Sequence, residues 1–331
     1  MTKSIRCRVV SWVGRVGRLR SCMRADTSLA WARAAIVMVA FAAAGSAVDA
    51  QELEPRAYGN TPTGLNFLIV GYGYSHGDVV TDPSVPLKNA NVEVHSTVLA
   101  YVRPLDVWGR SGKLEIVLPY AWASGTAEFL GQPQERQVSG LGDPMLLFSV
   151  NLYGAPALAP KEFAGYEQDL IIGASLQLSA PLGQYDSDKL LNIGTNRWSV
   201  KPELGLTQAW GPWTLELAAG ITFYTDNDDF LSGMTREQDP LHSVQGHIIY
   251  SFRSGIWVAL DATYYTGGRA TVDGVKDRDL QENWRLGTTV ALPVNRRNSI
   301  KLYASTGIYA RSGGNFDAVG IAWQHRWGGG L

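Results

Sequence analysis

The segment WTLELAAGITF, residues 213–223, alternates in polarity along its length. Trp213 and Leu215 fall on one face, and Thr214 and Glu216 fall on the other. Because successive side chains of a β-strand point to opposite faces, this pattern predicts a strand with one apolar and one polar side. Such a strand can separate an apolar environment from a polar one.

The same period of two residues recurs along the chain and predicts twelve strands in all. These are residues 64–75, 92–103, 113–121, 145–153, 169–180, 197–210, 213–223, 243–252, 256–265, 284–292, 299–310 and 316–327. Their connections alternate between short and long, except that 154–168 is long where a short one is expected and 311–315 is short where a long one is expected. An even number of strands of about ten residues, with alternating short turns and long loops, is typical of a transmembrane β-barrel.

The composition fits an all-β, single-domain membrane barrel. Of 331 residues only 18% are charged, and the net charge is -1, so no basic excess indicates a nucleic-acid partner. After residue 50 no apolar run approaches 18 residues, which argues against a transmembrane helix. Many tryptophans fall at or beside predicted strand ends, as in an interfacial girdle: Trp108, Trp122, Trp198, Trp210, Trp213, Trp257, Trp284 and Trp327.

Residues 1–50 have the pattern of a cleavable signal peptide. A basic region is followed by a short apolar stretch, 34–48, and by small residues at the expected cleavage point after Ala50. Met23 would give a leader of more ordinary length and is an alternative start. Both cysteines, Cys7 and Cys22, lie in the leader, so the exported chain would contain no thiol. We expect a periplasmic N-terminal segment at 51–63 and an outer-membrane barrel at 64–331.

Several segments resemble the outer-membrane family of transporters labelled as the meta-pathway of phenol degradation. They are SAPLGQY at 179–185, NIGTNRW at 192–198, KPE at 201–203, YTDN at 224–227, DPL at 239–241 and YYTGG at 264–268, together with Trp257, Arg285 and Gly287. The resemblance covers about residues 140–327. It implies a barrel in the bacterial outer membrane and suggests the passage of aromatic compounds.

The polar faces of the predicted strands carry charges of both signs. Because a charge that faces lipid is expensive, these side chains are expected to line the lumen. The candidate transport path comprises Arg197, Lys201, Glu203, Glu216, Gln245, His247, Asp261, Arg285 and Lys301. On one strand, we expect Arg197, Lys201 and Glu203 to form a mixed-charge ladder. Counting outward from the tight turn at 211–212 places Glu216 beside Thr207.

The expected function is passive uptake of small, apolar or aromatic solutes, without a cofactor and without catalysis. The single, scattered histidines predict no metal site. Two alternatives remain: a barrel hydrolase acting on lipid or peptide, and a structural barrel without transport. Ser243 and His247 share a face, but a strand would separate them by about 13 Å, too far for a nucleophile and its base. The expected partners are the solute, outer-membrane lipid and the barrel-insertion machinery.

Overall fold

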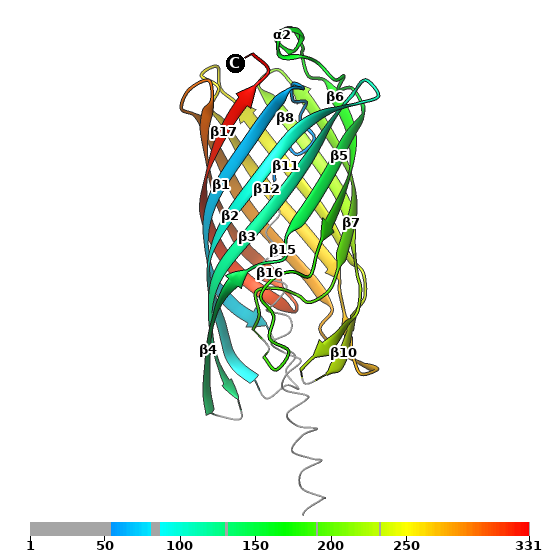
Figure 1. Ribbon diagram of the computed structural model, residues 1–331. Coiled ribbons are helices and arrows are strands. Elements are labelled where there is room, and N and C mark those ends of the chain that lie inside the picture. Colours follow the sequence, from blue (N-terminus) through cyan, green and yellow to red (C-terminus); the bar gives the residue numbers. More distant parts are fainter. Residues whose placement is uncertain (1–53, 81–86, 130–131, 190, 232, 331) are drawn as a thin grey trace, which may run out of the picture. The chain divides into compact units, whose positions relative to one another are not determined.

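The computed structural model describes residues 54–80, 87–129, 132–189, 191–231 and 233–330. Within these ranges, twelve long strands form the wall of one antiparallel barrel (Figure 1). They are β1 (Leu65–Val80), β2 (Leu87–Val107), β3 (Arg110–Phe129), β5 (Met145–Tyr153), β6 (Leu170–Ser179), β7 (Ser199–Trp210), β8 (Trp213–Tyr224), β11 (Leu241–Ser251), β12 (Trp257–Gly267), β15 (Gln281–Pro293), β16 (Asn298–Ala310) and β17 (Gly313–Gly328). Each corresponds to one predicted strand. The predicted leader lies outside the described residues.

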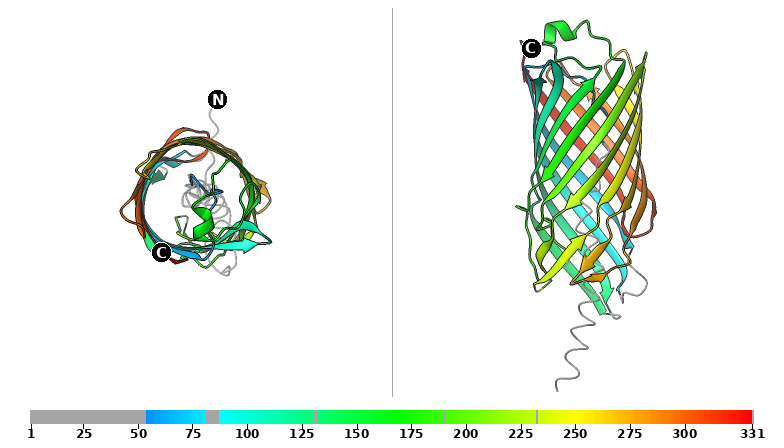
Figure 2. Two further views of the ribbon diagram at one scale, coloured as in Figure 1. Left: turned by 90° about the horizontal axis from the view of Figure 1, so that it is seen from above. Right: turned by 90° about the vertical axis from the view of Figure 1, so that its right-hand side faces the viewer.

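The ring is closed by pairing between the first and last strands. β1 pairs with β17 from Leu65↔Gly328 to Val80↔Gly313, and each remaining strand pairs with its neighbours along the chain. Figure 2 shows the closed ring from one end and the steep tilt of the strands from the side. The predicted fold, a transmembrane antiparallel barrel of twelve strands, is confirmed.

The two ends of the barrel differ. The short turns other than 311–312, the C-terminus and the helix α2 (Pro160–Phe163) lie at one end, the upper end in Figure 1. In outer-membrane barrels the short turns are periplasmic, so we assign this end to the periplasm and the other to the exterior. The long 154–168 connection, an exception to the predicted alternation, contains α2.

Four of the segments predicted as long outer loops contain strand residues. In 76–91, β1 extends to Val80 and β2 begins at Leu87. In 122–144, β3 continues to Phe129 and pairs with β4 (Gln132–Leu141), so this segment forms a hairpin. The segments predicted as loops at 225–242 and 266–283 form a second sheet of short strands, β9 (Asn227–Phe230), β10 (Met234–Gln238), β13 (Ala270–Val272) and β14 (Val275–Lys276). These extensions lack a lipid-facing side, so polarity alternation does not reveal them.

The predicted inside and outside faces agree with the exposure of the side chains. Leu217 and Ile248, predicted to face lipid, are 54% and 50% exposed, whereas Glu216 and His247 are 6% and 4% exposed. In water, a surface of this kind would expose a continuous apolar band, so the barrel is an outer-membrane barrel. No helix within the described ranges is both long and apolar enough to cross a membrane.

The tryptophan girdle has one exception. Trp108, Trp210, Trp213 and Trp284 project outward and are between 47% and 98% exposed. Trp257, however, shares the face of Asp261 on β12, and its ring lies under the guanidinium of Arg56 at 4.9 Å. Its place at a strand end made it a girdle candidate, but its phase in the strand points it into the lumen.

Candidate functional site

The strands bring three predicted lumen residues into one row. His247 on β11 lies opposite Glu216 on β8 and opposite Asp261 on β12. His247 Nδ1 and Asp261 Oδ1 are 2.7 Å apart, and Thr289 on β15 donates a hydrogen bond to Asp261 Oδ2 at 2.9 Å. A buried polar network therefore crosses four neighbouring strands of the wall.

A second pair lies on β7. Lys201 Nζ and Glu203 Oε2 are 3.1 Å apart, and Gln245 of β11 donates a hydrogen bond to the same carboxylate oxygen at 3.2 Å. Glu216 lies opposite Thr207, as expected from counting across the turn, and Thr207 donates a hydrogen bond to it at 3.2 Å. Four of the predicted lumen residues thus lie near one another on β7, β8 and β11.

Arg197 does not join this ladder. It precedes β7, and its Nη2 donates a hydrogen bond to Gln238 of β10 at 2.5 Å. Its guanidinium also lies 4.3 Å from the centre of the Tyr224 ring. The sequence predicted Arg197 as the first residue of the strand 197–210, but the chain bends there, and β7 begins at Ser199. The Arg197 side chain therefore connects the outer sheet to the outer end of the barrel.

The segment that precedes β1 lies inside the periplasmic end of the barrel, where Figure 2 shows it within the ring. The Tyr58 hydroxyl donates a hydrogen bond to Glu203 at 3.0 Å and lies 3.0 Å from Ser175 Oγ. The backbone N–H of Arg56 donates a hydrogen bond to the Glu216 carboxylate at 2.6 Å. Nη2 of the Arg56 side chain donates a hydrogen bond to Ser251 Oγ at 2.5 Å. Residues 54–58 therefore contact β6, β7, β8 and β11 and narrow the lumen.

Two lumen lysines, on β3 and β16, also contact residues 54–58. Lys301 on β16 forms an ion pair with Glu54 at 2.6 Å, and Lys113 on β3 donates a hydrogen bond to the carbonyl of Ala57. The predicted lumen residue Lys301 thus binds the N-terminal segment. Nothing in the polarity pattern of residues 51–63 indicated these contacts.

A pair of glycines makes room for Tyr58. Gly173 on β6 and Gly205 on β7 are direct cross-strand partners, and a Cβ atom at either position would overlap the Tyr58 ring. Interior strand glycines often mark a close approach of another group, so this signal was available in the sequence. Burial and the nearby carboxylate of Glu203 both raise the pKa of Tyr58, so its hydroxyl remains protonated and donates.

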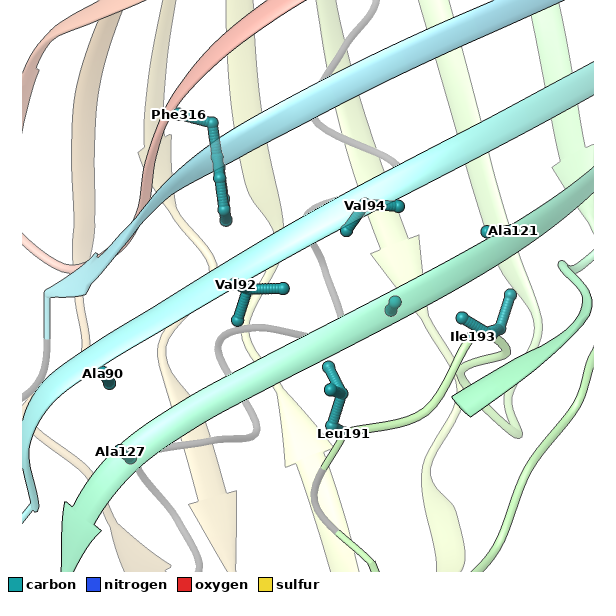
Figure 3. Close-up of a cluster of buried hydrophobic side chains, with 9 residues drawn as sticks. Ala90, Val92, Val94, Ala121, Ala127, Leu191, Ile193 and Phe316 are labelled. Atoms are coloured by element: carbon teal, nitrogen blue, oxygen red, sulfur yellow. The ribbon is translucent and has the colours of Figure 1, made fainter. Parts of the chain in front are cut away.

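The outer half of the lumen has an apolar wall. Leu191 and Ile193, from the connection between β6 and β7, pack against inward-facing side chains of β2, β3 and β17 (Figure 3). The cluster comprises Ala90, Val92, Val94, Ala121, Ala123, Ala127, Leu191, Ile193 and Phe316. Arg136 donates a hydrogen bond to the carbonyl of Leu191 at 2.9 Å, and Asp143 accepts from the N–H and hydroxyl of Thr195 at 2.8 and 2.7 Å. These bonds hold the connection against the apolar wall.

A cavity that opens to solvent adjoins the Lys201–Glu203 pair. Lys201 and Arg285 contribute the charged side chains of its lining, and Tyr224 and Tyr265 contribute aromatic rings. The predicted residue Arg285 therefore lies in a wall that faces free space, whereas Glu216, His247 and Asp261 are not among the cavity's lining residues.

No three His, Cys, Asp or Glu side chains in the described part of the chain are close enough together to hold a metal ion. The histidine of the hydrolase alternative, His247, is bonded to Asp261, while Ser243 lies four residues away on the same strand and lines the cavity. The arrangement offers polar side chains of both signs beside an apolar wall.

Solved outer-membrane barrels share this architecture. The crystal structure of the COG4313 outer membrane channel from Pseudomonas putida F1 has a TM-score of 0.72, 22% identity, and coverage of 83% of this chain and 100% of that one. The transport unit of the autotransporter AIDA-I from Escherichia coli has a TM-score of 0.52 and 9% identity, with 87% and 97% of the two chains covered. No curated protein matches this chain in sequence. The sequence profile of the family described as "Putative MetA-pathway of phenol degradation" matches residues 73–323, and the chain belongs to that family.

Proposed function

We propose that this barrel is a channel of the bacterial outer membrane for the passive uptake of small, apolar or aromatic solutes. The apolar wall in the outer half of the lumen carries this proposal. Val92, Val94 and Phe316 project inward from β2 and β17, where a channel for hydrophilic solutes would present polar side chains. Leu191 and Ile193 cover this wall, so an apolar solute that displaces their connection gains contact with it, while the polar row nearer the periplasm lines the rest of the route.

Membership in a family named for phenol degradation supports an aromatic solute, and the likeness to a solved outer membrane channel supports transport. Catalysis is not part of the proposal. The outward side chains contact lipid, and insertion by the barrel-assembly machinery remains a prediction.

Flux into lipopolysaccharide-containing vesicles tests the proposal, with protein-free vesicles as the baseline. Protein-dependent flux should be faster for phenol and benzyl alcohol than for arabinose or glycine. A V92T/V94T variant makes the inner wall polar with little change of shape and should lower the ratio of phenol flux to arabinose flux. V244T is the matched control, because Val244 faces lipid and is 44% exposed. Equal flux for all solutes would contradict the proposal, and no flux at all would favour a structural barrel.

A further inference from the structure

Arg285 is a buried lumen cation for which no ion pair is found within the described residues. Its side chain is 5% exposed, and none of the ion pairs of the described chain includes it. Nη2 donates hydrogen bonds to Ser305 Oγ at 3.0 Å and to the carbonyl of Phe316 at 3.1 Å, while Nε has no hydrogen-bond partner. A guanidinium that is shielded from water and lacks a counter-charge is costly unless an anion can join it.

The nearby acid does not supply that anion. Asp317 acts electrostatically on Arg285, but it is exposed between the buried residues Phe316 and Ala318, so it projects from the opposite face of β17. Its carboxylate accepts a hydrogen bond from Thr306 at 2.6 Å. The inward side of Arg285 is therefore left for a group from outside the protein.

That inward side borders the solvent-open cavity beside the Lys201–Glu203 pair. The lining residues include Lys201 and Arg285 but no Asp or Glu, and Lys201 already has Glu203 as its partner. The cavity therefore has a net positive wall. Asn315 is also in the lining, and Tyr224 and Tyr265 supply aromatic side chains for apolar contact.

We propose that this cavity is a binding site for an aromatic carboxylate, with the carboxylate on Arg285 and the ring against Tyr224 and Tyr265. A planar carboxylate matches the fork of a guanidinium and forms charge-assisted hydrogen bonds with it. A carboxylic acid is ionised at pH 7, whereas a phenol, with a pKa near 10, stays neutral, so the cation selects the acid. The inference rests on the proposed function, since it names a class of solute for the same lumen.

Calorimetric titration of the purified full chain in detergent tests the site. The ligands are benzoate, an anion, and benzyl alcohol, a neutral molecule of similar size. Benzoate should bind about tenfold more tightly than benzyl alcohol. Arg285→Gln should remove this difference in affinity. Arg326→Gln is the control, because Arg326 lies eleven residues beyond Asn315 on β17 and donates to the Arg296 carbonyl. It should bind benzoate as the unmodified protein does.

Asn315→Asp keeps the side-chain shape and places a carboxylate in the cavity, so it should also abolish the preference for benzoate. Heat-modifiable mobility on gels verifies that each variant is folded. Equal affinities for the two ligands, or a folded R285Q protein that binds benzoate undiminished, would overturn the site.

Vesicle flux of benzyl alcohol separates the two proposals. Flux without benzoate preference contradicts this site alone, and benzoate binding without flux of any solute supports the site and contradicts the channel.

Discussion

At the scale of single residues, adjacent positions on one strand face opposite environments. Ile248 faces lipid, while His247 lies between the carboxylates of Glu216 and Asp261. Ile248→Lys should lower the free energy of unfolding by about 2 kcal/mol, because a charge meets the hydrocarbon layer. His247→Lys should cost less than about 1 kcal/mol, because the new ammonium has a carboxylate on each side. Urea unfolding in lipid measures both, and equal losses would contradict the assigned faces.

The turn between β2 and β3 contains a strained residue. Trp108 has φ +53° and Gly109 has φ +80°, as in a two-residue hairpin turn in which both central residues have positive φ. Trp108 is 98% exposed and gains little from packing there. Trp108→Asn should be more stable than Trp108→Ala by about 1 kcal/mol, since both remove the ring but Asn tolerates this backbone conformation. The urea midpoint in micelles measures the difference. Trp108→Ala keeps the strain, and equal midpoints for the two variants would contradict the prediction.

The misplaced residues show what a two-residue period cannot reveal. Alternation gives the face of a residue once its strand is known, which is why Glu216 and His247 were placed correctly. Arg197 is buried, as expected of an inward-facing side chain, but it lies before β7 and not on it, and its position depends on contacts with Gln238 and Tyr224, both distant in sequence. Trp257 was misassigned because its place at a strand end was given more weight than its phase.

At the scale of elements, the N-terminal segment depends on the glycine pair that receives Tyr58. Gly205→Ala should displace the Tyr58 ring, loosen residues 54–63 and raise single-channel conductance in planar bilayers. Gly246→Ala is the matched control, because a Cβ there would meet its nearest neighbour at 3.6 Å, an ordinary contact. Protease should cleave the segment faster in G205A than in G246A. Unchanged conductance together with unchanged cleavage would mean that Tyr58 does not hold the segment in place.

The sequence predicted the elements of the wall but not those inside or above it. Each wall strand separates lipid from lumen, so its side chains alternate between apolar and polar. The N-terminal segment and the small sheet of β9, β10, β13 and β14 do not contact lipid. Their positions follow from particular contacts, such as Lys301 with Glu54 and Asn196 with Asn227 at 2.8 Å, which no local pattern encodes.

At the scale of the whole molecule, the distribution of lumen charge should set ion preference. Lys201 lines the cavity and is paired with Glu203, so Lys201→Gln leaves that carboxylate without its counter-charge. The reversal potential under a salt gradient should then shift toward cation preference. Lys276→Gln is the control, because Lys276 is half-exposed on the outer sheet and paired with Asp239. No difference between the two variants would place Lys201 away from the conducting route.

The even strand count and the contrast between short and long connections predicted the closed ring. The register could be predicted only across a tight turn, as for Glu216 and Thr207. The pairing of β1 with β17 has no turn to define it. Its register is fixed by packing, including the Tyr303 ring, which would overlap a Cβ at Gly320 of β17 and whose hydroxyl would crowd one at Gly73 of β1.

This pairing of the first and last strands also has a kinetic consequence. Bringing opposite ends of the chain together costs loop-closure entropy before any hydrogen bond between them forms, so sealing the ring is expected to be a slow, late event in assembly. Until it occurs, the sheet has two bare edges that can pair with another molecule. Tyr303, by spanning from β16 to β1, favours the sealed ring over this aggregation-prone intermediate.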